Sequence, residues 1–318
     1  MSREYAACVE GSGVGAVSTS APLATKSPAA DELPVFYINR ECDAQRRQSI
    51  TTYIDAAKLK AERVAGVEGL NVPEQFRQFF FEGDALHSKL KAGEVGCYAS
   101  HLVAMQLIIQ RNLSHALILE DDAILPADLN ETLAEVIASL PKGWDIVHLC
   151  KDSSRAVKVV ASLDGNRRLV RYSRVPETTT GYLVSHSGAE KFLKPMKRYW
   201  PVDTDFRQPW RFGLEIYGIT PRIISPSDFE SAIHQMGNHS RLRRGLPIPS
   251  RYCWTGNPLH TPEGVVFNLK TLGPVTWSLC AAHNTGRRLV SMLGLRPLIR
   301  RLGLQGIGTR FAENIAVR

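Results

Sequence analysis

Three consecutive carboxylates, Glu120, Asp121 and Asp122, interrupt the apolar stretch HALILEDDAIL in a chain of 318 residues. Carboxylates are hard oxygen ligands, and Mg²⁺ or Mn²⁺ commonly bridges one or two of them to substrate phosphates. Three adjacent acids also repel one another unless a cation lies near them. The alternative is that they cap the helix that follows, although Asp128 stands closer to its start. The triplet therefore favours metal or phosphate chemistry over capping.

The elements around the triplet predict where it lies. Apolar, strand-like runs at 33–39, 62–69, 115–119 and 144–150 alternate with helical spacing of apolar residues at 40–59, 93–112 and 129–140. Such alternation is typical of an α/β domain with a mainly parallel sheet and flanking helices. Ligands of such sheets bind outside the carboxyl ends of the strands, which is where the triplet falls. Because neighbouring strand residues point to opposite faces, we place the ion on Asp122.

Composition narrows the class of protein. The chain is 44% hydrophobic and 22% charged, which is typical of a globular protein. No run approaches the ~18 apolar residues of a membrane-spanning helix, and we expect no secretory signal. The six cysteines are scattered without a C-x-x-C pair, which argues against a disulfide framework and a thiolate zinc site. This use of cysteine is best explained by a protein that resides in the reducing cytosol.

The net charge of +8 is compatible with an acidic partner, namely nucleic acid, anionic lipid or a phosphorylated small molecule. Zinc-ligand spacing, an RNP-like motif and a basic stripe with interleaved aromatic residues are all lacking, so we expect no nucleic-acid partner. We predict a disordered segment at 1–32, a catalytic domain at 33–240 and a basic extension at 241–318. The arginine- and leucine-bearing stretch 286–304 either lies on an anionic membrane surface or packs on the domain as a helix.

Five stretches together resemble glycosyltransferase family 25, the lipopolysaccharide or lipooligosaccharide galactosyltransferase type. They are VFYINRECDAQRRQSI, GEVGCYASHLVAMQLI, HALILEDDAIL, TTTGYLVSHSGAEKFL and PVDTDF, in this order over residues 34 to 235. The resemblance implies a GT-A-like, Rossmann-type nucleotide-sugar fold. It also implies a UDP-sugar donor, usually UDP-galactose, inversion at the anomeric carbon, and a glycan or glycolipid acceptor of a surface glycan. Its acidic motif, which binds Mn²⁺ or Mg²⁺, falls on the triplet, with Asp122 as the direct ligand and Asp121 or Glu120 contacting the ribose or the groups around the metal.

The resemblance also implies further site residues. An inverting transfer needs a general base; the candidates are Asp203 and Asp205, and the family pattern favours Asp203. Capping of a turn, or binding of the acceptor without proton transfer, is the alternative for Asp203. The remaining donor-site candidates are Asn39, Arg40, Arg47, Ser100, His101, Thr180 and Gly181. His234, with His239 as its alternative, is the candidate that completes the metal site.

Several of these assignments have a purely structural alternative. Arg46 and Arg47 equally suit a solvated helix face, His101 suits a satisfied core residue, and Thr180 with Gly181 suits a tight turn. For the whole chain, the alternatives are a hydrolase with paired carboxylates and a catalytically silent sugar-binding homologue. A cytoplasmic enzyme, peripheral on the inner face of the membrane, is the expectation that combines these features.

Overall fold

The computed structural model describes residues 33–153, 155–227, 229 and 261–293, all within one compact unit, Leu33–Arg318. The predicted segment 1–32 and most of the predicted extension 241–318 lie outside these residues. The three domain boundaries therefore stay predictions.

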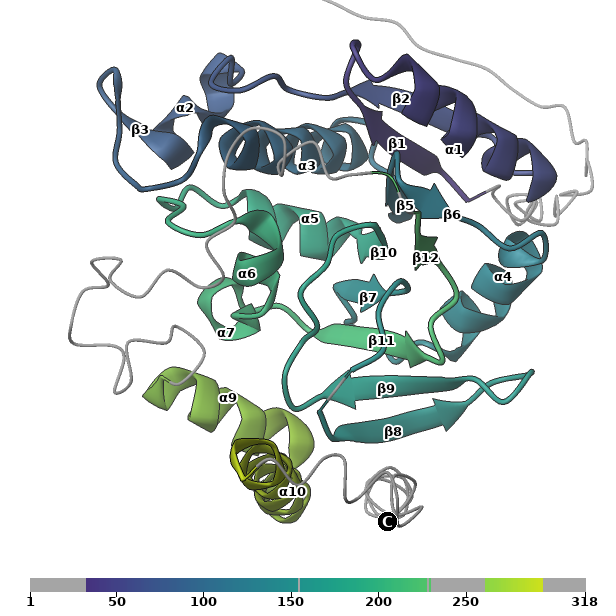
Figure 1. Cartoon of the computed structure of the whole chain (residues 1–318), viewed down its shortest axis with the longest axis vertical. Helices are drawn as coiled ribbons and strands as arrows, with labels where there is room; N and C mark the ends of the chain where they lie inside the picture. The colour runs from purple at the N-terminus through teal and green to yellow at the C-terminus, as the bar shows by residue number, and fades with distance from the viewer. Residues whose placement is uncertain (1–32, 154, 228, 230–260, 294–318) are drawn as a thin grey trace, which may run out of the picture. The chain divides into compact units, whose positions relative to one another are not determined.

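An eight-stranded sheet forms the centre of the domain (Figure 1). In order across the sheet its strands are β2 (Ala61–Ala65), β1 (Val35–Asn39), β5 (His115–Glu120), β10 (Gly181–Ser185), β7 (Ile146–His148), β11 (Ile216–Thr220), β9 (Arg168–Tyr172) and β8 (Val157–Ser162). Strands β10 and β9 run against the other six. The predicted α/β class with a mainly parallel sheet is confirmed, and the two opposed strands make it a mixed sheet.

Helices cover both faces of this sheet. One face carries α2 (Glu74–Phe80), α3 (Ala92–Gln110), α5 (His186–Leu193), α6 (Val202–Phe206) and α7 (Pro209–Phe212), and the other carries α1 (Ala44–Ala56) and α4 (Leu129–Ser139). Each face has its own apolar core, because alternate residues of the central strands point to opposite sides. Two short pairs, β3 (Phe81–Glu82) with β4 (Ala85–Leu86) and β6 (Ala123–Ile124) with β12 (Ser225–Pro226), lie outside the main sheet.

The predicted helix at 129–140 is confirmed as α4, which buries Leu129, Leu133 and Val136 against the sheet. Asp128 occupies the N-cap position, but its side chain caps no backbone N–H. Its carboxylate instead lies 3.7 Å from Arg167. Asp128, whose predicted capping role argued for metal chemistry at the triplet, thus occupies the N-cap position but makes no capping hydrogen bond.

The β8–β9 hairpin is an element that sequence patterns did not predict. A register shift between Val159 and Ala161 interrupts its pairing. Such a bulge breaks the two-residue alternation by which a strand is recognised in a sequence.

Helix α3 lies at the centre of the larger core. It is long and apolar enough to cross a membrane by length and composition, yet 56% of that stretch is buried inside the domain. Its apolar side chains join the core formed with α2, α5 and α6. It has the burial of a core helix.

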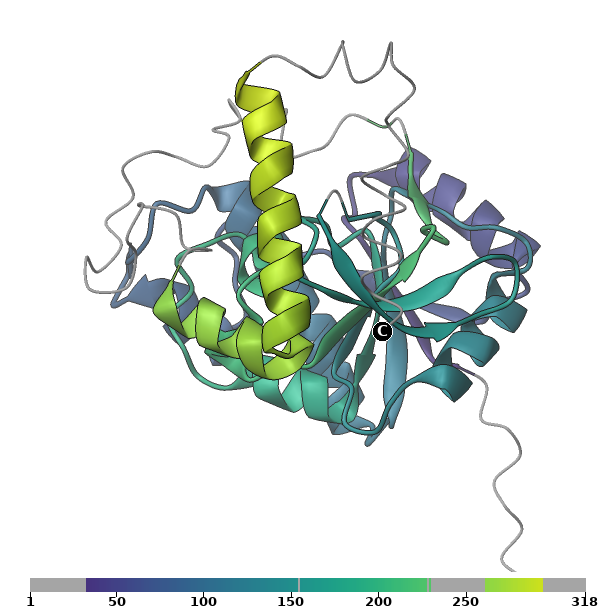
Figure 2. The same ribbon diagram turned by 90° about the horizontal axis from the view of Figure 1, so that it is seen from below.

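Helices α9 (Pro262–Leu272) and α10 (Pro274–Met292) pack beside the β8–β9 hairpin (Figure 1, Figure 2). Asn284 accepts a hydrogen bond from the Ala156 N–H at 3.1 Å and donates one to the Ser173 hydroxyl at 3.1 Å. Lys158 donates to the Leu272 carbonyl at 3.3 Å. The described part of the predicted extension is therefore joined to the α/β domain through the end of α9 and through Asn284 of α10.

Candidate active site

A cleft opens where β1, β2 and β5 end. Its walls come from the β1–α1 connection, the loop after β2, the first turns of α3 and the acidic triplet. The lining residues include Asn39, Arg40, Asp43, Arg46, Gly66, Val67, Gly69, Gly93, Cys97, Ser100, Glu120, Asp121 and Asp122. The three acids thus lie at the carboxyl edge of the sheet, as their position after β5 predicts.

One wall of the cleft is a contact between backbones. A Cβ on Gly96 of α3 would lie 2.4 Å from the Val67 carbonyl oxygen, so only glycine allows the helix to meet the loop after β2. Ser100, one turn later, accepts a hydrogen bond from the Val67 N–H at 2.8 Å and donates to the Gly96 carbonyl at 2.7 Å. Ser100 lines the predicted pocket and ties its two walls together.

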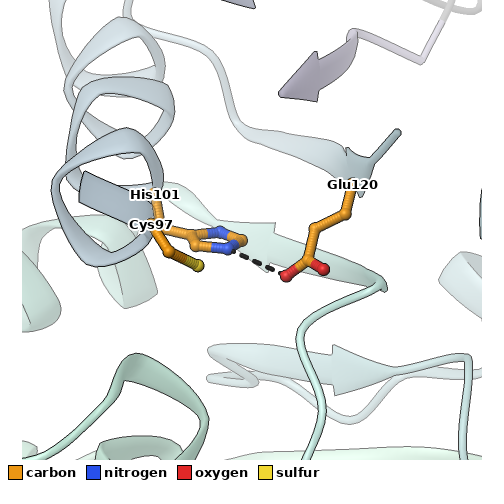
Figure 3. Close-up of side chains that lie close together, drawn as sticks. All are labelled: Cys97, His101 and Glu120. Atoms are coloured by element: carbon orange, nitrogen blue, oxygen red, sulfur yellow. Dashed lines mark hydrogen bonds and ion pairs between the residues drawn. The ribbon is translucent and has the colours of Figure 1, made fainter. Parts of the chain in front are cut away.

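Glu120 ends β5 and points toward α3 (Figure 3). Its carboxylate contacts His101 Nε2 at 3.2 Å and accepts a hydrogen bond from the Thr179 hydroxyl. His101 Nδ1 lies 3.0 Å from the Tyr182 hydroxyl, so one neutral tautomer satisfies the chain from Tyr182 through His101 to Glu120. Burial opposes ionisation of Glu120, but the hydrogen bonds from His101 and Thr179, together with nearby positive charge, outweigh it and lower the pKa of Glu120. Glu120 is therefore an ionised, fixed carboxylate.

Asp121 faces the β1–α1 side of the cleft. Asn39 donates to one of its oxygens at 2.8 Å, and Arg46 lies 2.6 Å from the other. Burial still raises the pKa of Asp121 against the opposing effects of Arg46 and Asn39. Both oxygens of Asp121 are already engaged by the protein.

Asp122 is the least satisfied acid of the triplet. Its Oδ1 is buried and accepts no hydrogen bond from any residue that the structure describes, and its Oδ2 is 3.7 Å from Arg46. Burial, followed by the charge of Glu120, raises the pKa of Asp122 to about 7. A bound divalent cation would supply the missing partner and hold the carboxylate ionised. The residues present thus fit the predicted metal, with Asp122 as its principal ligand.

A second group of donor atoms lies deeper. The ligand atoms of Cys97, His101 and Glu120 all lie within 4.8 Å of one another (Figure 3). Burial, together with the charge of Glu120, raises the pKa of the Cys97 thiol well above its usual value. Both ring nitrogens of His101 already have partners. A protonated thiol is a poor ligand, and thiolate suits softer ions than Mg²⁺ or Mn²⁺, so this group fits the predicted cation less well than Asp122.

The two acids of PVDTDF occupy different environments in α6. Asp203 accepts a hydrogen bond from the Thr204 N–H at 2.7 Å, and burial, with the charge of Glu177, raises its pKa to about 6. The charge of Glu120 adds to the rise in the pKa of Asp203. Asp205 is fully buried, with Tyr98 at 2.9 Å and Arg211 at 2.5 Å on its oxygens. Asp205 is a core ion pair, not an open base.

The β1–α1 connection differs from its predicted use. Arg47, expected to bind a phosphate, lies 3.2 Å from Glu41, whereas its neighbour Arg46 faces the acids. Arg40 donates two hydrogen bonds to Asp43, at 2.7 and 3.1 Å. Asn39 is buried, and its amide is used by Asp121 and the Asp43 carbonyl. Asn39 thus holds the acids in place, and Arg46 is the cation that sequence reasoning placed second to Arg47.

The threonine–glycine stretch, predicted to meet the donor sugar, has core side chains and Glu120 as neighbours. A Cβ on Gly181 would lie 2.7 Å from Ile224 Cδ1, so core side chains fill the space expected for a sugar. The Thr180 carbonyl accepts the Glu120 N–H at 2.9 Å. Thr179, which sequence reasoning missed, is the residue whose side chain reaches Glu120. The run of three threonines in the sequence could have indicated a hydroxyl near the acids. The direction in which each side chain points determines that Thr179 is the one that reaches Glu120.

His234 and His239 lie outside the described residues, so the histidine predicted to complete the metal site stays a prediction.

An α/β sandwich with carboxylates at the edge of its sheet is the architecture of Rossmann-like glycosyltransferases. Residues 32–206 match the model of glycosyltransferase family 25 (LPS biosynthesis protein). The chain belongs to glycosyltransferase family 25, and the resemblance of its five motifs is confirmed.

Several relatives carry names from the same family. A glycosyltransferase 25 family member of Aedes aegypti is 28% identical over 185 residues, which cover 53% of this chain and 29% of that protein. Procollagen galactosyltransferase 1 of Danio rerio is 26% identical over 196 residues, 57% of this chain and 32% of that protein. Inactive glycosyltransferase 25 family member 3 of Mus musculus is 24% identical over 220 residues, 61% of this chain and 37% of that protein. The chain thus spans only about a third of the length of these relatives.

Proposed function

We propose that the protein is a divalent-metal-dependent, inverting glycosyltransferase that moves a hexose from a UDP-sugar to a sugar of a surface glycan. One observation carries this proposal: the buried, unpartnered oxygen of Asp122 in the cleft at the end of β5. Family membership supports the reaction class. The word galactosyltransferase in the name of the Danio rerio relative supports galactose as the sugar.

The acidic cleft is the donor side of the proposed site. When bound, Mn²⁺ or Mg²⁺ supplies positive charge that stabilises the departing diphosphate. Asp122 would hold this ion. Asp121, fixed by Asn39 and Arg46, keeps the guanidinium of Arg46 within the cleft, where it would bind a phosphate of the donor. Glu120, fixed by His101 and Thr179, shapes the inner end of the cleft.

Asp203 is the proposed general base. An acceptor hydroxyl loses its proton to Asp203 as its oxygen bonds to the anomeric carbon, and the bond from that carbon to the diphosphate oxygen breaks on the opposite face. A pKa of about 6 leaves Asp203 ionised at neutral pH yet basic enough to take a proton. Asp205 positions the same helix through Tyr98 and Arg211.

The acceptor is proposed to be a sugar of lipopolysaccharide or lipooligosaccharide. The description of the matching family as an LPS biosynthesis protein supports this choice. The relatives named procollagen galactosyltransferase act on a different acceptor by name. The choice of acceptor therefore rests on the family description alone.

The test is UDP binding with and without Mn²⁺, followed by a screen of UDP-sugars for transfer and hydrolysis. The proposal expects UDP binding that depends on Mn²⁺ and turnover of one UDP-hexose. A hydrolase with paired carboxylates would bind neither UDP nor Mn²⁺. A silent homologue, for which the inactive Mus musculus relative is the precedent by name, would bind UDP and turn nothing over.

We further propose that the C-terminal stretch holds the enzyme on an anionic membrane surface at the cytoplasmic face. Leu289, Met292 and Leu293 are all more than half exposed at the end of α10, in a stretch rich in arginine. Apolar residues among basic ones suit such a surface. Sedimentation with anionic liposomes, with and without residues 286–318, tests this; equal binding by both forms would remove the membrane proposal.

A further inference from the structure

A second cavity lies between β9 and α7 on one side and α9 and α10 on the other. Its volume is about 450 Å³, within the range of sites that bind small ligands. Its walls carry four arginines, Arg155, Arg171, Arg174 and Arg207, and two tryptophans, Trp210 and Trp277. None of the described residues that line it is acidic. The cavity is therefore a basic, partly aromatic site, separate from the acidic cleft.

The four arginines are not equally neutralised. Arg171 pairs with Glu215, and Arg207 lies 2.8 Å from Glu177. The buried Nε of Arg174 donates to no residue that the structure describes, although the charge of Glu177 acts on this guanidinium. Burial, together with the charges of Arg207 and Arg155, lowers the pKa of Arg174 to about 10. An anion in the cavity would relieve this repulsion and complete the hydrogen bonding of Arg174.

The chemistry of the walls indicates the kind of anion. Guanidinium groups match the geometry of phosphate and carboxylate oxygens. The cavity also presents two indole rings and the amides of Asn268 and Asn284. Aromatic surface combined with a few placed polar groups is suited to an organic ligand, not to a bare ion.

The cavity is joined to the proposed base by a short series of contacts. Arg207 lines the cavity and pairs with Glu177. Glu177 accepts a hydrogen bond from the Thr204 hydroxyl at 3.3 Å, and the Thr204 N–H donates to Asp203 at 2.7 Å. Arg207 and Glu177 also act on the pKa of Asp203. A ligand on Arg207 would thus be connected through Glu177 and Thr204 to Asp203, the proposed base.

We propose that this cavity binds the acceptor glycan through an anionic group on a sugar, either a phosphate monoester or a carboxylate, with Arg174 as the principal contact. The inference rests on the proposed function, because it assigns the cavity to the acceptor of the same reaction. It adds the substrate class, namely a glycan that carries negative charge close to the hydroxyl that is glycosylated.

The experiment uses the full chain and four probes: glucose 6-phosphate, glucuronate, glucose and inorganic phosphate. Binding is followed by tryptophan fluorescence and by ligand-observed NMR. At least one anionic sugar should bind tenfold or more tightly than both glucose and inorganic phosphate, and the preferred one identifies the group as phosphate or carboxylate. Glucose that binds as tightly as both anionic sugars would overturn the proposal. Inorganic phosphate that binds as tightly would show an anion site without sugar recognition, which overturns it too.

Two substitutions of the same arginine and one control complete the test. Arg174→Gln should weaken binding of the preferred sugar at least tenfold. Arg174→Lys keeps the charge but loses the paired N–H donors of the guanidinium, so it should weaken binding less. Arg77→Gln on α2, whose arginine pairs with Asp84 outside the cavity, should bind as wild type does. Unchanged binding in both Arg174 variants would contradict the proposal. The thermal midpoints of both Arg174 variants should not fall. Arg174→Gln removes a partly buried charge, and Arg174→Lys keeps the charge that the wild type already holds.

UDP binding in the presence of Mn²⁺ separates this inference from the proposed function. Arg174→Gln should leave it unchanged, since Arg174 lies outside the acidic cleft. If wild type binds no UDP but binds the anionic sugar through Arg174, the proposed reaction and the acceptor role fail, and the cavity stands only as a site for an anionic sugar. If UDP binds and the anionic sugar does not, the cavity assignment fails alone.

Discussion

The acidic cleft and the arginine-lined cavity differ in the sign of the charged group that each leaves incompletely paired. In the cleft, Asp121 and Asp122 share the cation of Arg46, and one buried oxygen of Asp122 is left without a partner among the described residues. In the cavity, carboxylates neutralise Arg171 and Arg207, and the buried Nε of Arg174 donates to no described residue. Among the described residues, each region therefore retains a buried charged group with an atom that lacks a hydrogen-bond partner, Asp122 in the cleft and Arg174 in the cavity. The difference in sign teaches that the cleft is suited to a cation and the cavity to an anion, and the proposed base Asp203 is linked to the cavity through Thr204 and Glu177.

The largest effect is expected from Asp122→Asn, which removes the unsatisfied charge of the cleft. Transfer should fall by about 1,000-fold, and Mn²⁺-dependent UDP binding should be lost with it. The apo protein should become more stable at pH 8, because the substitution removes a carboxylate that the fold holds with a raised pKa. Activity assays and thermal unfolding measure the two effects.

The control for this change is Asp84→Asn, at a fully exposed side chain, which should alter neither quantity. Full transfer activity in Asp122→Asn would place the metal elsewhere and dissolve the contrast between the two regions.

Asp203→Asn tests the residue between the two regions. Turnover should drop by about 100-fold while UDP binding persists, because a general base contributes roughly that factor and does not hold the donor. In wild type, turnover should decline as the pH falls through about 6, where Asp203 becomes protonated. Steady-state kinetics from pH 5 to 8 would show both; unchanged turnover in Asp203→Asn would make Asp203 a bystander.

A paired comparison of Arg46→Gln and Arg47→Gln sharpens the description of the cleft. Arg46 lies against Asp121 and Arg47 against Glu41, which is largely exposed. Arg46→Gln should weaken UDP binding about tenfold, as expected for the loss of a charge-assisted contact with a phosphate. Arg47→Gln should bind UDP within about twofold of wild type, since exposed ion pairs contribute little. The reverse order in a calorimetric titration would restore Arg47 as the phosphate ligand.

The smallest effect is a pH-dependent gain in stability from the metal. Because the folded-state pKa of Asp122 is raised to about 7, its contribution to stability is present at low pH and is lost as the pH rises through about 7. Mn²⁺ binds the ionised carboxylate, so it should raise the melting temperature by a few degrees more at pH 8 than at pH 6. Asp122→Asn should abolish this difference. Equal shifts at both pH values in wild type would contradict the assignment.

Sequence patterns could predict what depends on local order. The acids after an apolar run, the amphipathic α4 and the alternation of strands and helices are all properties of neighbours along the chain. They located the cleft and the α/β class. The five motifs supplied the family.

The remaining features depend on contacts between distant residues. Whether Arg46 or Arg47 faces the acids is set by the rotation of α1 against the sheet, and both suit the same helical pattern. Asp203 and Asp205, two residues apart, differ because α6 turns one toward Glu177 and the other into the core beside Tyr98. The arginine-lined cavity draws residues from β9, α7 and α10, so no local motif could show it.

The contact of Gly96 with the loop after β2 has a consequence for how the enzyme meets its donor. Two backbones that touch directly have no rotamers through which to yield. This side of the cleft is therefore preorganised: it has its final shape before any nucleotide arrives, and little conformational entropy is lost there on binding. Any induced fit must occur on the other sides of the cleft. Gly96→Ala should accordingly impair donor affinity more than a change of one methyl group suggests, because the added carbon displaces an entire wall.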